Sequence, residues 1–342
     1  MPNAGQRYSD VVISGLAHLD APQVLTSEAI EDRLAPAMKR LGVGRGLLGR
    51  LVGISQRRVW DEGTPPSDPA AEAGRRAIER SGVPAEQLGM LVNTSVSRDF
   101  LEPSTASIVH GKLGLPTTAM NFDLGNACLG FVNGMNLVST MIERGEIDHG
   151  IVVNAESSRF VVESTIERLL TKGTPEVLRE QFATLTLGSG AVAMVLSRKG
   201  TVDDGHAYLG GLSRASTQHA HLCTGHAHEM LTDLRGLLDA GIELGHLTWK
   251  EAVDAYGWDP DGFDLYALHQ VSLVHTRAVC DTLGIDPQRV PLIFPEHGNM
   301  GPASVPYVLS KAAEEGRLRR GDKAVLMGIG SGLNACAAEV HW

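Results

Sequence analysis

Short apolar segments alternate with amphipathic ones along the chain, and this pattern predicts β-strands separated by helices. The continuous apolar runs at 10–17, 89–94 and 149–155 are typical of strands that are covered on both faces in a parallel-rich sheet. The amphipathic segments 26–42 and 67–82 each end at a glycine, as helices commonly do. Strand–helix alternation of this kind predicts an α/β fold.

The second half of the chain repeats features of the first. A phenylalanine followed closely by Gly-Asn precedes a predicted helix at 122–126 and again at 294–299. The tripeptide Gly-Ser-Gly precedes a predicted strand at 188–190 and at 330–332. Such a duplication predicts two similar layers of parallel-rich sheet, with helices between and outside them.

We therefore predict two similar halves, residues 1–200 and 201–342. The first half carries an insertion of amphipathic helical character at about 157–186. The helices that follow the two Gly-Asn turns are expected to be the buried central pair. The strands of the second half are expected at 208–212, 264–270, 290–294 and 324–340.

The stretch 120–145 carries a cysteine at the point where a strand is followed by a helix. From Cys128 to the end of the stretch the only charged residues are Glu143 and Arg144, which suits a buried central helix. The positive field of a helix N-terminus stabilises a thiolate, whose parent thiol has a pKa of about 8.5. The alternative for Cys128 is a small buried hydrophobic residue.

Composition narrows the class of protein. The 342 residues are enough for two units of about 150 residues each, and 39 glycines suit many tight strand–helix turns. A net charge of −10 argues against general nucleic-acid binding, and no apolar run approaches the ~20 residues that span a bilayer. The four cysteines show no disulfide-like pattern and the first residues hold no apolar signal core, so a soluble, cytoplasmic protein is expected.

Candidate chemistry follows from the predicted symmetry, which places Cys128 and Asn299 at one site, with His269 at the end of a neighbouring strand. A cysteine, a histidine and an asparagine suit nucleophilic attack on a carbonyl. The His269 Nε2–H and the Asn299 amide can hold one oxygen anion, and the backbone N–H groups of Cys128 and Ser331 can hold a second. Two such sites facing one cysteine indicate acyl transfer followed by carbon–carbon bond formation.

These residues resemble the thiolase superfamily, specifically its ketoacyl synthase III-like branch. The resemblance covers nearly the whole chain and rests on Asn126-Ala-Cys128, His269-Gln, His297-Gly-Asn299 and Gly330-Ser-Gly332. It implies a five-layered αβαβα fold, a homodimer and acyl-thioester substrates, with coenzyme A as part of the substrate and no separate cofactor. It also implies that Cys128, His269 and Asn299 are the catalytic triad.

One residue indicates which members of this branch the chain resembles most. Decarboxylating ketoacyl synthases usually carry an apolar residue before Pro-Ser, whereas this chain has Glu102. A simple acyl-CoA donor must lose an α-proton to a base, while a malonyl donor forms its carbanion by losing carbon dioxide. Glu102 and its surroundings resemble the thiolases of bacterial olefin biosynthesis, which join two long-chain acyl-CoAs head to head. In that type the glutamate reaches the partner subunit's active site.

Three functions therefore remain open. The first is non-decarboxylative Claisen condensation of two long-chain acyl-CoAs, with downstream olefin-pathway enzymes as further partners. The second is a decarboxylating ketoacyl-ACP synthase III, and the third is an acyl-thioester hydrolase. An exposed loop carboxylate without a catalytic role is the alternative for Glu102.

Other polar groups carry weaker hypotheses. Arg57 or Arg214 could hold the coenzyme A phosphates, although no residue is assigned to them, and Leu51 stands about where ketoacyl synthase III commonly has an arginine. A cluster of metal-ligating residue types has a spacing that matches no common metal motif, and no metal is expected. Its members are His219, His221, Cys223, His226 and His228.

Overall fold

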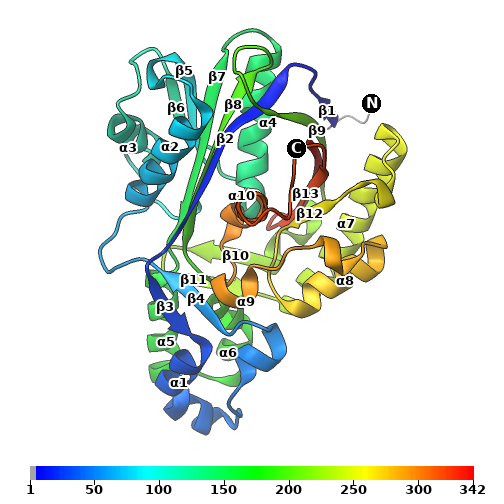
Figure 1. The fold of residues 1–342 in the computed structure, drawn as a ribbon. Coiled ribbons are helices and arrows are strands. Elements are labelled where there is room, and N and C mark those ends of the chain that lie inside the picture. The colour runs from blue at the N-terminus through cyan, green and yellow to red at the C-terminus, as the bar shows by residue number, and fades with distance from the viewer. Residues whose placement is uncertain (1–4) are drawn as a thin grey trace.

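Ten strands form one hydrogen-bonded series in the computed structural model, which describes residues 5–342 (Figure 1). Nine of them follow one another as β12 (Leu265–Leu268), β13 (Lys323–Gly330), β14 (Asn334–His341), β9 (His206–Ala215), β2 (Val11–Asp20), β8 (Gly190–Arg198), β7 (His149–Glu156), β5 (Leu88–Asn93) and β6 (Met120–Asp123). The tenth, β1 (Gly5–Arg7), pairs with β9 outside the main order.

The series contains the same strand arrangement twice. In the first half β6, β5 and β7 run parallel, and β8 and β2 follow antiparallel. In the second half β12 and β13 run parallel, and β14 and β9 follow antiparallel. The two arrangements meet where β2 pairs with β9 at Val12–Ala207 and Ile13–His206. The division of the chain at residue 200 stays a prediction.

The strand predicted at 290–294 is wrong. The chain there forms a short 3₁₀ turn (Pro287–Arg289), an irregular segment and the four-residue helix α9 (Phe294–His297). The Gln270 side chain takes the place of a strand partner, since its Oε1 accepts the N–H of Ile293 at 2.9 Å and its Nε2 donates to the carbonyl of Pro291 at 2.5 Å. Pro291 also lacks the N–H that a ladder requires.

Helices cover both faces of each half of the sheet. The first half is covered on its outer face by α2 (Ser67–Ser81) and α3 (Thr105–Leu113), and the second half by α7 (Leu234–Tyr256) and α8 (Leu273–Leu283). The buried helices α4 (Gly130–Glu143) and α10 (Ser304–Glu314) pack between the two halves in one shared core. This is the predicted five-layered αβαβα fold.

The central helix α4 lies close to the sheet because two of its residues have no side chain. A Cβ atom on Gly130 would lie 3.0 Å from the carbonyl oxygen of Thr94, and one on Gly134 would lie 2.9 Å from the Thr94 Cγ2 atom and 3.0 Å from a methyl carbon of Val152. The helix therefore packs directly on β5 and β7, and its N-terminal turn is held at their ends.

A smaller lobe extends from one end of the layers (Figure 1). It contains α1 (Ser27–Leu41), α5 (Arg159–Lys172) and α6 (Pro175–Gln181), with the hairpin of β3 (Gln23–Thr26) and β4 (Gln56–Val59). The segment 157–186 is thus helical, as predicted. A second hairpin, β10 (Cys223–His226) and β11 (Glu229–Thr232), lies beside it.

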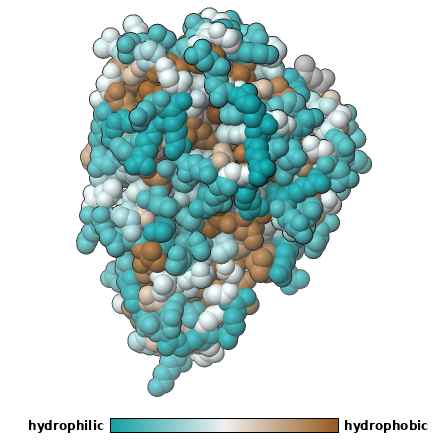
Figure 2. All heavy atoms as spheres, viewed as in Figure 1, coloured by the Kyte–Doolittle hydropathy of each residue, from teal (hydrophilic) through white to brown (hydrophobic). Residues whose placement is uncertain are grey.

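Most of the surface in the view of Figure 2 is hydrophilic, and hydrophobic atoms are visible in recesses between polar side chains. Within residues 5–342, none of the helices combines the length and the apolar character needed to cross a bilayer.

Candidate active site

The turn that carries Cys128 has an unusual backbone. β6 ends at Asp123, and a short 3₁₀ helix (Ala127–Leu129) leads into α4. Ala127 has a φ of 44°, in the left-handed region that residues with a side chain rarely adopt. Backbone strain of this kind concentrates at functional sites. Nothing in the sequence signalled it, because alanine has no preference for that conformation.

Two glycines of β13 bring Cys128 and His269 to the same place. A Cβ atom on Gly330 would lie 3.3 Å from the backbone nitrogen of Cys128. A Cβ atom on Gly328 would lie 2.7 Å from a methyl carbon of Leu129 and 3.3 Å from the Cβ of His269. Ser331 follows Gly330 directly, so its backbone belongs to the same cluster.

His269 and Asn299 are in direct contact. The His269 Nε2 atom lies 3.3 Å from the Asn299 Oδ1 atom, and the same oxygen accepts the N–H of Gly301 at 2.9 Å. Because that oxygen accepts from the chain, the Nε2 atom of His269 must donate to it. The Asn299 backbone is bound on both sides, by the carbonyl of Thr186 and the N–H of Gly188, each at 2.9 Å. The amide nitrogen of Asn299 remains available to donate.

Burial shifts the pKa values of Cys128 and His269 so that their neutral forms are favoured. Burial raises the pKa of Cys128 to about 12, and the nearby Cys223 and Glu156 act in the same direction. Burial also lowers the pKa of His269 to about 4, with a further contribution from His275. Desolvation of the charge thus opposes a thiolate at Cys128 and outweighs the favourable field of one helix end. Thiol and imidazole are both neutral near pH 7.

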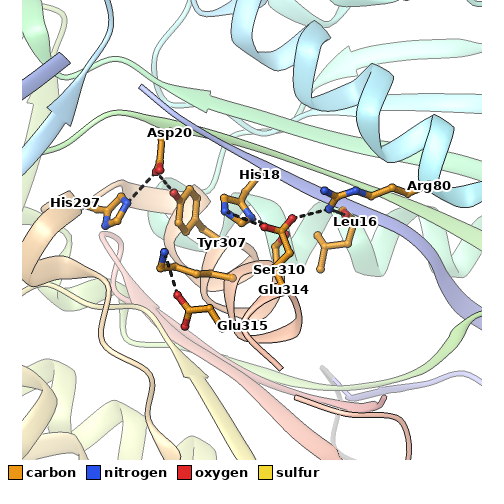
Figure 3. A network of polar contacts seen from close by, with 10 residues as sticks. Leu16, His18, Asp20, Arg80, His297, Tyr307, Ser310, Glu314 and Glu315 are labelled. Carbon is orange, nitrogen blue, oxygen red and sulfur yellow. Dashed lines mark hydrogen bonds and ion pairs between the residues drawn. The ribbon is translucent and has the colours of Figure 1, made fainter. Parts of the chain in front are cut away.

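A polar network that sequence reasoning missed holds the segment before Asn299 (Figure 3). His297 is 4% exposed, and its Nε2 atom lies 2.9 Å from Asp20 Oδ1, which also accepts the hydroxyl of Tyr307. The His297 Nδ1 atom lies 3.2 Å from the carbonyl of Ile293, so both ring nitrogens face acceptors. These contacts fix His297, and with it the Gly298–Asn299 turn. Only the His297-Gly-Asn motif hinted at this role.

Glu102 makes none of the contacts that hold this cluster together. It is exposed, and it makes no hydrogen bond or ion pair with another of the residues that the structure describes. It belongs to residues 95–104, called the Glu102 segment below, which connect β5 to α3. Within one chain, contacts therefore link Cys128, His269, Asn299 and Ser331, and none of these contacts includes Glu102.

Comparison with known proteins decides the family. The model for 3-oxoacyl-[acyl-carrier-protein] synthase III matches residues 122–211, and the model for its C-terminal part matches 253–342. The chain is 49% identical to the acyl-CoA:acyl-CoA alkyltransferase of Xanthomonas campestris pv. campestris, over 98% of this chain and 99% of that protein. It is 36% identical to the enzyme of the same name from Shewanella oneidensis, over 98% of this chain and 100% of that protein. The chain belongs to the acyl-CoA:acyl-CoA alkyltransferase family.

Solved structures agree with this assignment to the OleA family. Xanthomonas campestris OleA with bound cerulenin superposes with a TM-score of 0.96 at 49% identity, over 98% of each chain. A cysteine-to-serine variant of that protein, solved with lauric acid and lauroyl-CoA, also gives 0.96 at 49%, over 98% of this chain and 100% of that chain. The family confirms the predicted thiolase-like fold and the predicted acyltransferase class.

The predicted coenzyme A contacts of this OleA family member need one correction. Arg57 is fully buried and donates to the Ser27 hydroxyl at 3.1 Å and to the carbonyl of Leu185 at 2.8 Å, so it is not available to a phosphate. Arg214 is exposed and paired with Glu251, and its contact with coenzyme A stays a prediction.

Among residues 5–342, no three His, Cys, Asp or Glu side chains are grouped so that they could hold a metal ion.

Proposed function

We propose that this chain joins two long-chain fatty acyl-CoAs by non-decarboxylative Claisen condensation, through an acyl-Cys128 intermediate. The observation that carries the proposal is the cluster of Cys128, His269, Asn299 and Ser331, in a member of the acyl-CoA:acyl-CoA alkyltransferase family. The product is a 2-alkyl-3-ketoacyl-CoA, and one free CoA is released for each pair of substrates.

The first half-reaction loads Cys128. Its sulfur attacks the thioester carbonyl of the first acyl-CoA, the carbon–sulfur bond to CoA breaks, and the thiol proton is transferred to the departing CoA sulfur. The carbonyl oxygen becomes an anion during the attack, and the backbone N–H groups of Cys128 and Ser331 stabilise it. The strained turn at Ala127 presents the sulfur and this backbone N–H to the same substrate.

The second half-reaction forms the carbon–carbon bond. The α-carbon of the second acyl-CoA loses a proton to Glu102, and the enolate oxygen accepts a hydrogen bond from the Asn299 amide and one from the His269 Nε2–H, which it shares with the Asn299 Oδ1 atom. A neutral imidazole suits this role, because it keeps its N–H as a donor. The carbanion then attacks the acyl-Cys128 carbonyl, and the Cys128 sulfur leaves and takes up the proton that Glu102 had accepted.

A homodimer would supply Glu102 to this site. The Glu102 segment exposes apolar side chains beside the carboxylate: Val96 is 60% exposed, Phe100 60% and Leu101 89%. The neighbouring edge strand β6 leaves one row of backbone groups unpaired, with Met120 half-exposed. Exposed apolar groups beside an open sheet edge favour a second copy of the chain as their cover. Glu102 then reaches the partner subunit's Cys128 site.

One incubation separates the candidate functions. A single long-chain acyl-CoA is supplied without any malonyl donor, and the products are analysed by mass spectrometry. Condensation gives a β-keto acid or the ketone derived from it, and Cys128→Ala abolishes it. Free fatty acid alone would instead support a hydrolase, and no turnover until malonyl-ACP is added would support a decarboxylating synthase. A cytoplasmic location and downstream olefin-pathway partners remain predictions.

A further inference from the structure

A buried carboxylate that the condensation chemistry leaves unused lies beside the active site. Glu156 ends β7 and is 7% exposed. A Cβ atom on Gly301 would lie 3.9 Å from the Glu156 Cγ atom, so the carboxylate borders the turn that follows Asn299. Its charge also acts on Cys128, whose pKa it raises. An acidic group this close to the cluster needs a role or a partner.

The partners of Glu156 are the first residues of the Glu102 segment. One carboxylate oxygen accepts the backbone N–H of Val96 at 2.8 Å and the side-chain amide of Asn154 at 3.3 Å. The other accepts the backbone N–H of Ser97 at 3.2 Å and its hydroxyl at 2.9 Å. All four groups are donors, so the site matches an ionised carboxylate, which only accepts. Burial opposes this ionisation and raises the pKa of Glu156 to about 7.

A second carboxylate holds the middle of the same segment. Asp99 accepts the backbone N–H of Ser67 at 2.9 Å and the Ser67 hydroxyl, at the start of α2. The Asp99 backbone N–H donates to the Thr105 hydroxyl at 3.3 Å. Between Asp99 and the start of α3, residues 100–103 make no hydrogen bond with the described part of the chain. The place of Glu102 in space is therefore set by anchors on either side of it.

We propose that Glu156 is a positioning residue for the condensation step, whose carboxylate fixes the Glu102 segment so that Glu102 meets the partner subunit's site. The inference rests on the proposed function, because it assigns to Glu156 an effect that passes through the Glu102 base. The proposal also predicts different effects of Glu156 on the two half-reactions. Loading of Cys128 does not use Glu102, and loss of the Glu156 charge removes an influence that opposes the Cys128 thiolate.

The test compares Glu156→Gln with the unchanged dimeric enzyme. Glutamine keeps the size and one acceptor for Val96, but its NH₂ group meets the donors of Ser97. We expect acylation of Cys128, followed by intact mass in a single turnover, to stay within about twofold, while condensation falls about tenfold or more. Ser97→Ala removes one donor and should slow condensation by about threefold. Glu146→Gln, at an exposed carboxylate paired with Arg144, should change neither step.

The same substitution is then made in Glu102→Gln enzyme, and its residual condensation is measured at high enzyme concentration. If Glu156 acts through Glu102, Glu156→Gln causes no further loss in that background. A further tenfold loss there, or an equal loss of acylation and condensation in the single variant, overturns the positioning role and leaves the proposed function standing. Normal condensation by Glu102→Gln alone overturns the role of Glu102 as the base and with it the positioning role, whereas only the absence of condensed product with the unchanged enzyme overturns the proposed function. If Glu156→Gln does not fold, Ser97→Ala in the two backgrounds decides in the same way.

Discussion

The Nε2 atom of His269 lies 3.3 Å from the Oδ1 atom of Asn299, and this contact orients both side chains. The Asn299 oxygen also accepts the N–H of Gly301, which leaves the amide nitrogen of the side chain as the group that can donate to a ligand. The two residues come from different elements, the end of β12 and the turn after α9. Together they present N–H donors beside the Cys128 turn without any positive charge.

The first prediction separates the two sets of oxyanion donors. Asn299→Ala should still form acyl-Cys128, because the backbone N–H groups of Cys128 and Ser331 serve the first carbonyl. Condensation should fall by about 100- to 1,000-fold, the usual effect of losing one oxyanion donor. Intact mass measures the first step and product mass spectrometry the second. Failure of the variant to become acylated would show that the division between the two sets is wrong.

The second prediction concerns the state of the Cys128 thiol. With its pKa raised to about 12 by burial, the rate of alkylation by iodoacetamide should keep rising through pH 9 without a plateau. Cys128→Ala provides the background from the other three cysteines. A plateau reached below pH 7 would mean that the helix end does stabilise a resting thiolate.

The third prediction asks which subunit supplies the base. Glu102→Gln keeps the size of the side chain and removes the base, so it should acylate Cys128 normally and condense at least about 100-fold more slowly. Mixed dimers of Glu102→Gln with Cys128→Ala chains should regain activity, because one site then pairs an intact Cys128 with the partner's Glu102. Isolated mixed dimers that stay inactive would place Glu102 in its own chain's site.

The fourth prediction is a loss of stability in acid. Desolvation lowers the pKa of the partly buried His275 from 6.5 to about 4. The unfolded chain therefore binds a proton that the folded chain does not, so stability is full above pH 6.5 and is lost as the pH falls toward 4. The loss from this residue is on the order of 3 kcal/mol. In urea titrations His275→Gln should lose less stability over that range than the wild type. The exposed His221→Gln should match the wild type, and equal losses in all three would contradict the account.

Local signals predicted most of the fold. The glycines that end the segments 26–42 and 67–82 placed the ends of two helices where the structure has them. The prediction of a strand at 290–294 was wrong because the apolar residues of this segment resemble a strand. In the structure the Gln270 side chain, and not a neighbouring strand, forms hydrogen bonds with the backbone there. A single side chain from a distant segment leaves no local pattern that could reveal this.

The sequence predicted which residues form the site, but not the protonation of Cys128 or the contacts of Glu156. The motifs around Cys128, His269 and Asn299 placed the cluster correctly, because turns that follow strands and precede helices converge at one end of such a fold. The pKa of Cys128 depends on how far the folded chain desolvates the thiol, which no local motif reports. Glu156 was missed because its four donors come from residues 96–97 and 154, which only the β5–β7 pairing brings together.

The central claim is that Cys128 carries the first acyl chain while a second acyl-CoA loses its α-proton and attacks it. The enzyme is loaded with a ¹³C-labelled long-chain acyl-CoA, freed of excess substrate, mixed with unlabelled acyl-CoA, and quenched within one turnover. Mass spectrometry should find a product with one labelled and one unlabelled chain, and the labelled chain should provide the ketone carbon. Release of the label as free fatty acid, with a product built from two unlabelled chains, would contradict the claim.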